Sequence, residues 1–314
     1  MKVYQKLTLF LTLKTTDLNI VILSRNASLY STQSLVNAAR LRNHYVRVVD
    51  HLMCDLIIEK GKCQVSYNNN ILSNVDAVIP RIGASATTMG AAVLRQFESQ
   101  GVFLTLNATP LMRARNKLSC LQILAGAGIA VPKTVYASNL QTLPFILNDM
   151  GSFPIIIKLM NGTQGMGVIL AENKSNAESI MEAFHTTNER VILQKFVKEA
   201  KGADIRAFVV DGKVVGAMKR QARPGDFRSN LHRGGTSEKI VLSKDEETTA
   251  LKSVELLGLN IAGVDMLKTH NGPVVLEVNA SPGLEGIEGT TEVDIAGEII
   301  SFVERAYQNY KSNK

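Results

Sequence analysis

The chain lacks tryptophan, and aromatic residues make up only 5% of its 314 residues. So few aromatic rings give little support for base-stacking platforms, and we therefore expect no direct readout of nucleic acid. The three cysteines, Cys54, Cys63 and Cys120, match the spacing of neither a disulfide framework nor a metal site. This cysteine usage favours a reducing compartment, the cytoplasm.

Long hydrophobic runs are also missing. No segment approaches the length of a membrane span, so we expect no membrane partner. Residues 1–18 carry Lys2 and Lys6 beside a mostly apolar run at 7–13, which is short for an export signal and has no small-residue cleavage site after it. We interpret residues 1–18 as an extension ahead of the first core strand, with a weak secretion signal as the alternative.

The excess charge is positive, with a net charge of +7 and a pI near 9.2. This balance predicts an anionic partner, for which nucleotide phosphates, acidic peptides and nucleic acid are candidates. The content of 45% hydrophobic and 20% charged residues is ordinary for a soluble globular protein. The length allows two or three packed units.

The first third of the chain alternates strand patterns with helix patterns. The expected strands are 19–23, 46–50, 76–79 and 102–106, and the expected helices are 31–43 and 87–100. This alternation predicts βαβ units and a parallel sheet. The loop after the first strand contains no GxGxxG sequence, so a dinucleotide site is not indicated there.

The rest of the chain carries helix boundary signals. We expect a helix from near Leu111 to Gly126, and strands at 153–158 and 191–197. The sequences 175–178 and 243–246 match capping boxes that open helices. Gly258 is the expected C-cap of the second of these helices, and Asp294 the expected start of a final amphipathic helix.

A predicted hairpin around the turn at 270–273 carries polar side chains where a strand should have core. Period-two alternation places Glu277 and Asn279 on the same face as Val275. A loop with an odd number of residues sets Asp265 across from Glu277, whereas a two-residue turn would offset them and favour a plain solvent-exposed face. Facing carboxylates repel unless a hard cation lies between them. The set is therefore a candidate Mg²⁺ site.

Gly162, Gly165 and Gly167 belong to a predicted hairpin tip. A tip without side chains lets backbone N–H groups approach phosphate oxygens closely. It is not a Walker loop, because no Gly-Lys-Ser/Thr ends it, and a flexible turn is the alternative interpretation. Lys158, at the end of the preceding strand, is a cation directed to the same place and favours phosphate binding.

Charged residues also cluster between the glycine tip and the acidic hairpin. Asp204 and Arg206 lie two residues apart on one strand face, where cross-strand ion pairs are the plain interpretation. The loop 220–235 contains four arginines and His232, and these positive charges repel one another unless an anion is present. Solvated loop charge is the alternative. Arginine's planar fork suits carboxylate and phosphate oxygens two at a time.

The order of lysine, glycine tip, arginine-rich loop and acidic hairpin resembles the ATP-grasp superfamily over nearly the whole chain. More specifically, the chain is similar to the RimK-type glutamate ligases in the runs 79–83, 162–165, 225–235 and 277–288. The resemblance implies an α/β and α+β chain, with an N-terminal parallel βαβ domain followed by a two-lobed ATP-grasp fold. The expected division is 19–110 for the first domain, 111–193 for lobe 1 and 194–314 for lobe 2.

The resemblance also implies a role for each site residue. The residues expected to meet ATP phosphates are Lys117, Lys158, Gly162, Thr163, Gln164, Gly165 and Gly167. The residues expected to meet adenine and ribose are Gln194, Lys195, Phe196, Val197 and Asp204. The nucleotide or transferring phosphate would touch Arg228, Ser229 and Asn230, and the metals, two ions of Mg²⁺ or Mn²⁺, would be held by Asp265, Glu277 and Asn279. One departure is Lys195, which stands where the family tends to have a glutamate; if that carboxylate receives the adenine amino group, ATP affinity would fall.

The implied activity is ATP-dependent addition of L-glutamate to the acidic C-terminal tail of a small-subunit ribosomal protein, through an acyl-phosphate. Arg206, Arg228 and Arg233 are the expected catalytic residues, and Arg81 is a candidate for binding a substrate carboxylate. The family's habit implies a homotetramer. The alternatives are a ligase that acts on a carrier protein or a small glutamylated cofactor, and a catalytically weak ribosome-binding module.

Overall fold

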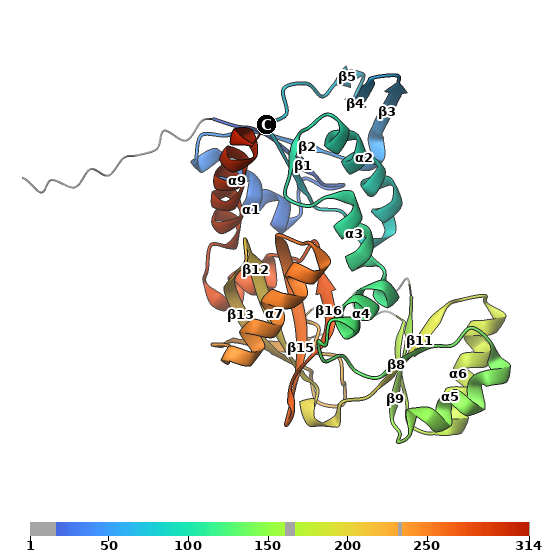
Figure 1. Ribbon diagram of the computed structural model, residues 1–314. Coiled ribbons are helices and arrows are strands. Elements are labelled where there is room, and N and C mark those ends of the chain that lie inside the picture. Colours follow the sequence, from blue (N-terminus) through green and yellow to red (C-terminus); the bar gives the residue numbers. More distant parts are fainter. Residues whose placement is uncertain (1–16, 161–166, 232–233, 314) are drawn as a thin grey trace, which may run out of the picture.

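A computed structural model describes residues 17–160, 167–231 and 234–313 of the chain. Figure 1 shows an upper α/β part in blue and teal, a lower part in gold and orange, and a smaller green and yellow part that projects to one side. Except for Asp17 and Leu18, the expected extension 1–18 lies outside the described residues. Leu18 is already buried, with 2% of its surface exposed.

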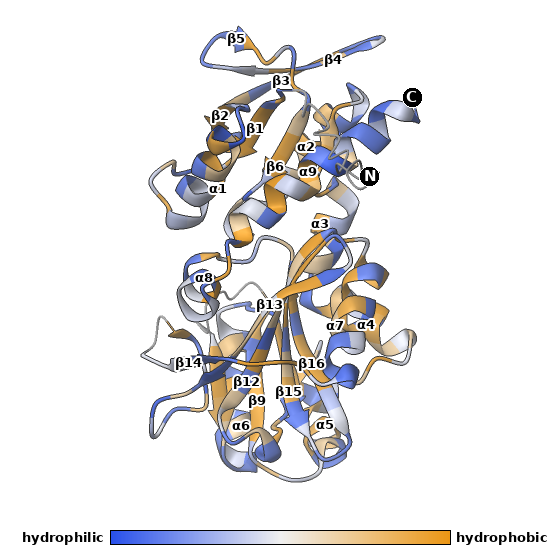
Figure 2. Cartoon of the chain, turned by 90° about the vertical axis from the view of Figure 1, so that its left-hand side faces the viewer, coloured by the Kyte–Doolittle hydropathy of each residue, from blue (hydrophilic) through white to orange (hydrophobic). Residues whose placement is uncertain are grey.

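The sheet of the upper part is parallel, as the alternation of strands and helices predicted. Its strand order is β2-β1-β6-β7, and each of these pairings is parallel. The strands and helices of this part are β1 (Asn19–Leu23), α1 (Tyr30–Leu41), β2 (Tyr45–Val49), β6 (Ala77–Pro80), α2 (Thr87–Ser99) and β7 (Phe103–Leu104). Figure 2 shows β1 and β6 as largely hydrophobic strands, as expected for strands buried on both faces.

Two features of the upper part come from distant or unexpected segments. The C-terminal helix α9 (Ile295–Ser312) packs against α1, and it begins where expected, because the Asp294 carboxylate accepts a hydrogen bond of 2.8 Å from the Gly297 N–H. A small antiparallel sheet was not predicted. Its strands are β3 (Cys54–Glu59), β4 (Lys62–Tyr67) and β5 (Asn70–Ile71).

The expected single helix after Leu111 is two helices, α3 (Ala108–Arg115) and α4 (Lys117–Gly126). Asn116 lies between them with extended backbone angles, φ −84° and ψ 104°, so the first helix cannot continue through it. Its side chain instead caps the second helix by accepting a 3.0 Å hydrogen bond from the Ser119 N–H. The break is therefore built by a capping asparagine.

The projecting part is an antiparallel sheet in the order β10-β9-β11-β8, covered by two helices. Its elements are β8 (Thr134–Tyr136), α5 (Leu143–Met150), β9 (Ile155–Leu159), β10 (Val168–Ala171), α6 (Lys174–Thr186) and β11 (Val191–Lys195). The capping box expected at Ser175 is wrong, because α6 starts two residues earlier. Asn173 is the N-cap, and its side chain accepts a 2.9 Å hydrogen bond from the Asn176 N–H.

The lower part is a five-stranded sheet in the order β14-β13-β12-β15-β16. Its elements are β12 (Ala203–Val210), β13 (Lys213–Gln221), β14 (Thr236–Lys239), α7 (Lys244–Leu257), β15 (Ile261–Thr269), β16 (Gly272–Asn279) and α8 (Glu285–Thr291). Short 3-10 turns are η1 (His51–Met53), η2 (Ala84–Ala86), η3 (Leu140–Thr142) and η4 (Lys198–Ala200). The capping box of Ser243 with Glu246 and the left-handed C-cap at Gly258 are both confirmed for α7.

The cores of the upper and lower parts are continuous, whereas the projecting part has its own. Phe208 of β12 belongs to the same cluster of buried residues as Ile22 of β1 and Ile299 of α9. The cluster under α5 and α6 contains only residues of the projecting part. Among the described residues, no helix is both long enough and apolar enough to cross a membrane.

We predict that Phe208→Ala destabilises the protein. Phe208 is fully buried between the two joined parts, so truncation leaves a cavity and lowers the free energy of unfolding by about 3–5 kcal/mol. Phe145→Ala is the matched control, because Phe145 is 76% exposed, and it should change stability by no more than about 0.5 kcal/mol. Urea unfolding measures both variants. Equal midpoints would contradict the shared core.

Candidate active site

The acidic hairpin brings its two carboxylates face to face, by a route different from the expected one. The turn is closed by the pair Thr269 and Gly272, so it holds two residues, and the expected odd-numbered loop is wrong. A bulge at Leu276 adds one residue to β16, and Asp265 pairs with Glu277 beyond it. The bulge therefore restores the register that a two-residue turn alone would have offset.

The bulge also changes which side chains of β16 share a face. Simple alternation grouped Val275 with Glu277, but Val275 and Val278 are both in the core, while Glu277 is exposed. An extra residue shifts the alternation by one. Glu277 and Asn279 consequently point away from the core that Val275 fills.

Asp265 is held by arginines from two neighbouring strands. The Arg206 guanidinium donates to both Asp265 oxygens, with Nε–Oδ1 at 2.7 Å and Nη2–Oδ2 at 2.6 Å. Arg220 lies 3.1 Å from Asp265 and also pairs with both oxygens of Asp204, with Nε–Oδ1 at 2.7 Å and Nη2–Oδ2 at 2.5 Å. Cross-strand ion pairs, the plain interpretation of Asp204 and Arg206, are therefore present. We call these four residues the ion chain.

The ion chain is nearly out of contact with water. The side chains of Asp204, Arg220 and Asp265 are 8%, 4% and 10% exposed. Burial opposes ionisation of Asp265, but Arg206 and Arg220 outweigh it and hold its pKa below the usual range. Asp265 is thus an ionised carboxylate at neutral pH. The Asn279 amide lies 3.5 Å from it, so the three residues expected to hold metal do gather at one place.

Two lysines from separate elements approach the same hairpin. The Lys158 ammonium donates a 2.6 Å hydrogen bond to the Gln194 side chain, and Lys117 donates a 2.9 Å bond to the Met160 carbonyl. Burial lowers the pKa of both amines, for Lys158 to about 8, while Glu277 opposes the shift in each. The resemblance to the ATP-grasp ligases implies that both lysines meet ATP phosphates. Both lysines lie near enough to Glu277 for its charge to act on them.

The arginine-rich loop lies against the segment that follows β11. Phe227 of the loop meets Phe196 edge to face, with ring centroids 6.3 Å apart, and the Arg228 guanidinium lies 5.4 Å from the Phe227 ring centre. Arg228 also pairs with Asp226 at 3.0 Å. Ser229 is buried beside them, and Asn230 is partly buried. The loop thus brings residues expected at the nucleotide next to residues expected at adenine.

Some expected site residues fall outside the described part of the chain. They are Gly162, Thr163, Gln164, Gly165 and Arg233. Gly167 is described, and its φ of +69° lies in the left-handed region. A Cβ there would clash with the Leu159 side chain, so this position requires glycine.

Sequence reasoning missed Arg115 and gave no site role to Arg220. Arg115 ends α3, and its pKa is lowered by burial and raised by Glu277, so it shares the lysines' acidic neighbour. The sequence offered no signal for it beyond its place two residues before Lys117. Five buried or half-buried cations therefore surround the three carboxylates Asp204, Asp265 and Glu277, and Arg81 adjoins this group through Arg115; the five are Arg115, Lys117, Lys158, Arg206 and Arg220. This excess positive charge favours an anionic ligand.

The donor set at the hairpin suits a hard cation. Asp265, Glu277 and Asn279 offer carboxylate and amide oxygens, the ligands that Mg²⁺ takes when phosphates supply the rest. Glu277 forms no ion pair with any other described residue, so its carboxylate is available. No cluster of three or more His, Cys, Asp or Glu side chains that could hold a metal ion occurs among the described residues.

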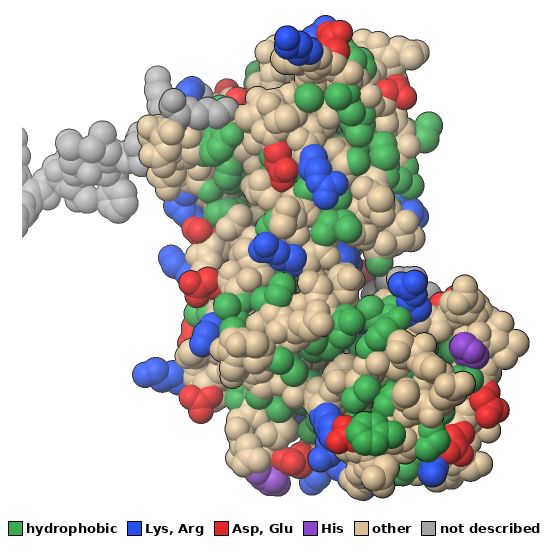
Figure 3. All heavy atoms as spheres, turned by 45° about the vertical axis from the view of Figure 1, so that its right-hand side comes forward, with side chains coloured by type: hydrophobic (Ala, Val, Ile, Leu, Met, Phe, Trp, Pro, Cys, Tyr) green, Lys and Arg blue, Asp and Glu red, His purple; other side chains and the backbone are tan. Residues whose placement is uncertain are grey.

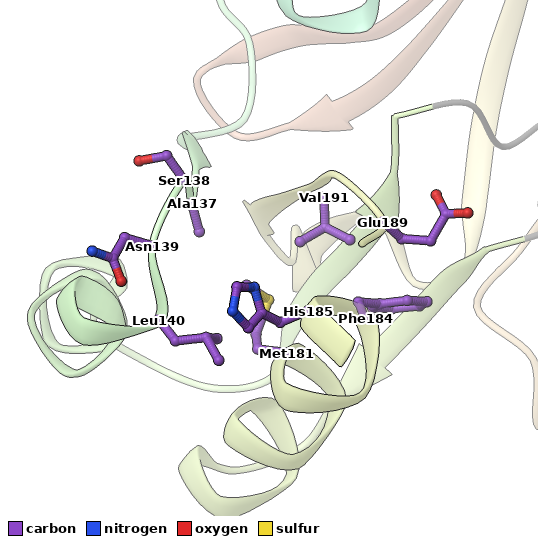
Figure 4. Close-up of a pocket in the computed structure, with 9 residues that line it drawn as sticks. All are labelled: Ala137, Ser138, Asn139, Leu140, Met181, Phe184, His185, Glu189 and Val191. Atoms are coloured by element: carbon purple, nitrogen blue, oxygen red, sulfur yellow. The ribbon is translucent and has the colours of Figure 1, made fainter. Parts of the chain in front are cut away.

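A small cavity of about 30 Å³ lies elsewhere, between the segment after β8 and helix α6. Figure 4 shows Met181, His185 and Leu140 around it. None of the expected site residues lines it. In the space-filling view the projecting part stands out from the body of the molecule with a notch between them (Figure 3). The charged residues above come from elements on both sides of that junction.

Comparisons with known proteins cover nearly the whole chain. The model of a RimK-like ATP-grasp domain matches residues 114–303, and that of a RimK pre-ATP-grasp domain matches residues 18–111. A protein of Alcanivorax borkumensis, named probable alpha-L-glutamate ligase, is 48% identical over 94% of this chain and 98% of its own. One of Hahella chejuensis, named probable alpha-L-glutamate ligase 1, is 50% identical over 94% of this chain and 97% of its own.

Two solved structures are similar in fold. The ATP-grasp ligase PsnB, in complex with a minimal precursor, Mg and ADP, has a TM-score of 0.71 at 21% identity and covers 92% of this chain and 98% of that one. D-alanine–D-alanine ligase from Bacillus anthracis has a TM-score of 0.67 at 18% identity and covers 95% of this chain and 100% of that one. These likenesses confirm the expected ATP-grasp fold.

We predict an unusual titration for Lys158. With its pKa lowered to about 8, the amine loses its charge as the pH rises through that value, whereas an exposed lysine stays charged to about pH 10.4. The rate of acylation of Lys158 by an amine-specific reagent should reach half its plateau near pH 8. Exposed Lys213 is the internal control, and peptide mass mapping across a pH series reads out both. Coincident profiles would show that burial does not shift Lys158.

We also predict that Arg220→Gln is strongly destabilising. It leaves Asp204 buried without its cationic partner, which costs about 3–5 kcal/mol of unfolding free energy. Arg305→Gln removes an arginine from an exposed pair with Asp211, with side chains 53% and 42% exposed, and should cost no more than about 1 kcal/mol. Denaturant unfolding compares them. A small loss for Arg220→Gln would show that Asp204 is not held as an ion.

Proposed function

The chain belongs to the RimK-like ATP-grasp family and is a ligase that forms a carbon–nitrogen bond, and we propose that it adds L-glutamate residues to the acidic C-terminus of a small-subunit ribosomal protein. The observation that carries this proposal is the excess of buried cations around Asp265 and Glu277. ATP, glutamate and an acidic tail are all anions. A site of this charge therefore suits every substrate of the reaction.

The proposed ATP site lies between the projecting part and the hairpin. Lys117 and Lys158 neutralise the phosphates in this proposal. The N–H of Lys195 is already bonded to the Lys133 carbonyl at 2.9 Å, which leaves the backbone of Phe196 and Val197 to read adenine. If the backbone reads adenine, the family's usual glutamate is not needed there, and the exposed Lys195 side chain at the end of β11 is compatible with ATP binding. Asp204, whose oxygens pair with Arg220, is the proposed ribose ligand.

The proposed metal ligands are Asp265, Glu277 and Asn279, holding two ions of Mg²⁺ or Mn²⁺. A metal held by these residues would supply positive charge that neutralises the ATP phosphates. The ion chain orients Asp265 for this task, because Arg206 and Arg220 fix both of its oxygens. The protein thereby supplies a carboxylate that is ionised and positioned before any ligand arrives.

The proposed reaction has two steps. An oxygen of the acceptor carboxylate attacks the γ-phosphorus of ATP, ADP leaves, and an acyl-phosphate forms. The glutamate α-amine then attacks the acyl carbon, phosphate leaves with the C–O bond electrons, and the amide forms with loss of a proton. Arg206, Arg228 and Arg233 stabilise the negative charge that develops in both steps. Positioning and charge stabilisation suffice, so no covalent enzyme nucleophile takes part.

We further propose the following domain organisation and assembly. Residues 19–110 form the pre-ATP-grasp domain, 111–193 the first lobe and 194–314 the second, in a cytoplasmic homotetramer.

Two other functions would use the same ATP and metal site and differ in the acceptor or in the turnover. One is a ligase for a carrier protein or a small glutamylated cofactor, and the other is a ribosome-binding module with weak turnover. The acceptor and the turnover distinguish them.

The test is an intact-mass time course of the ribosomal protein with the enzyme, ATP, Mg²⁺ and glutamate. We expect successive additions of glutamyl mass. Glu277→Gln should slow them by more than about 100-fold, since even mutations of outer-shell partners cost up to that much. Glu277 is exposed and forms no ion pair with another described residue, so this variant should remain folded. Glu255→Gln, an exposed glutamate of α7, is the matched control and should act like the wild type.

Other outcomes separate the alternatives. ATP consumption with small glutamyl peptides, but no change in the ribosomal protein, would move the acceptor to the carrier or cofactor class. No ATP consumption with any acceptor would favour the binding module.

A further inference from the structure

Two arginines lie where the upper part meets the lower part, and backbone carbonyls hold both of them. Arg81 follows β6 and donates a 2.7 Å hydrogen bond to the Pro282 carbonyl, just beyond β16. Arg115 ends α3 and donates to the Ile82 carbonyl. The two guanidinium groups are thus fixed by three separate segments of the chain.

Among the described residues, no carboxylate is directly paired with either arginine, although the charge of Glu277 acts on Arg115. Neither Arg81 nor Arg115 forms an ion pair with a described residue, and the residues outside the described part contain no Asp or Glu. Burial and the charge of Arg115 lower the pKa of Arg81 to about 10. The guanidiniums therefore repel each other in a site from which water is largely excluded. Such an arrangement is costly unless an anion from outside completes it.

Unused hydrogen-bonding atoms point to the same place. In the described part of the chain, the buried Nε of Arg115 and the buried hydroxyl of Ser281 have no hydrogen-bond partner. Ser281 directly precedes Pro282, whose carbonyl Arg81 binds. Buried polar atoms are nearly always paired, so orphaned donors beside two cations indicate a missing polar ligand.

The site adjoins the proposed centre of reaction. A Cβ built on Gly263 would lie 3.0 Å from the Pro282 side chain and 3.7 Å from Nε of Arg206. Gly263 thus lies between Pro282 and the arginine that grips Asp265. A ligand at Arg81 and Ser281 would be next to Arg206. The lysines that we assign to the phosphates come from other elements, α4 and β9.

We propose that Arg81, Arg115 and Ser281 form a carboxylate-binding subsite that holds and selects a substrate of the ligase. This inference rests on the proposed function. The carboxylate belongs either to the free amino acid or to the acidic end of the acceptor. A planar carboxylate pairs with guanidinium forks two oxygens at a time. A neutral amide of the same shape would leave buried charge uncompensated, so the subsite rejects glutamine in favour of glutamate.

The test is calorimetric binding to the full chain, saturated with Mg²⁺ and a non-hydrolysable ATP analogue. The probes are L-glutamate, L-glutamine, a peptide ending in glutamates and the same peptide with its carboxylates amidated. We expect Arg81→Gln and Arg115→Gln each to weaken binding of one acidic probe by about tenfold or more. The probe affected identifies the source of the carboxylate. Affinity for the nucleotide analogue should stay within about twofold of the wild type.

Arg113→Gln is the matched control, because it removes the same charge from an exposed position on the same helix. Ser281→Ala is the second variant and keeps both arginines, so it tests the subsite even if an arginine variant fails to fold. It should weaken the same acidic probe and leave the melting temperature unchanged. Arg81→Lys and Arg115→Lys keep the charge but lose the fork, and should recover only part of the affinity.

Three outcomes would overturn the subsite. In the first, the arginine and serine variants bind both acidic probes as tightly as Arg113→Gln does. In the second, the variants lose affinity for the nucleotide analogue and keep their affinity for the acidic probes. In the third, the wild type binds no acidic probe. The proposed function fails separately, when the wild type transfers no glutamate to the ribosomal protein. Arginine-dependent binding of an acidic probe would then still uphold the subsite.

Discussion

The buried ion chain across three neighbouring strands is the constraint on which the active site depends. Arg220 on β13, Asp204 and Arg206 on β12 and Asp265 on β15 pair only across strands. Both oxygens of each carboxylate accept hydrogen bonds from an arginine. These bonds compensate for the water that the carboxylates and the arginines lose on burial. A slip of one residue in either strand pairing would turn a charge into the core and break the chain. The charges therefore fix the register of the sheet that carries the site.

The same region holds more positive charge than its own carboxylates can balance. Asp204 and Asp265 are paired within the ion chain, and Glu277 is the carboxylate whose charge acts on all three of the cations Arg115, Lys117 and Lys158; Asp265 also acts on Lys158. Burial has already lowered the pKa of these groups, which means that the folded protein holds them at a cost. An anionic ligand reverses that cost when it binds. Affinity for phosphate and carboxylate groups then comes from an arrangement that folding has built in advance.

Sequence patterns predicted the parts of the fold whose causes are local. The parallel sheet, the capping box at Ser243 and the helix start at Asp294 each follow from a few adjacent residues. Two features were missed. The small sheet β3-β4-β5 depends on pairing between its strands, and the break at Asn116 comes from a capping asparagine, a local signal that the helix pattern masked. At the hairpin, the facing of Asp265 and Glu277 was predicted with the wrong turn. The bulge at Leu276 was not predicted, because no local sequence pattern indicated it.

Arg115 shows why a site assembled from distant segments escapes sequence reasoning. Its neighbours in the site are Glu277 and Arg81, and Arg81 lies 34 positions earlier in the sequence. Packing of α3 against the lower part brings these residues together. Motifs identify residues that act with near neighbours in sequence. Arg81 is held by the carbonyl of Pro282, just past the proposed metal ligands. The upper part therefore contributes a guanidinium to the site itself, so the substrate subsite exists only when both parts are folded against each other.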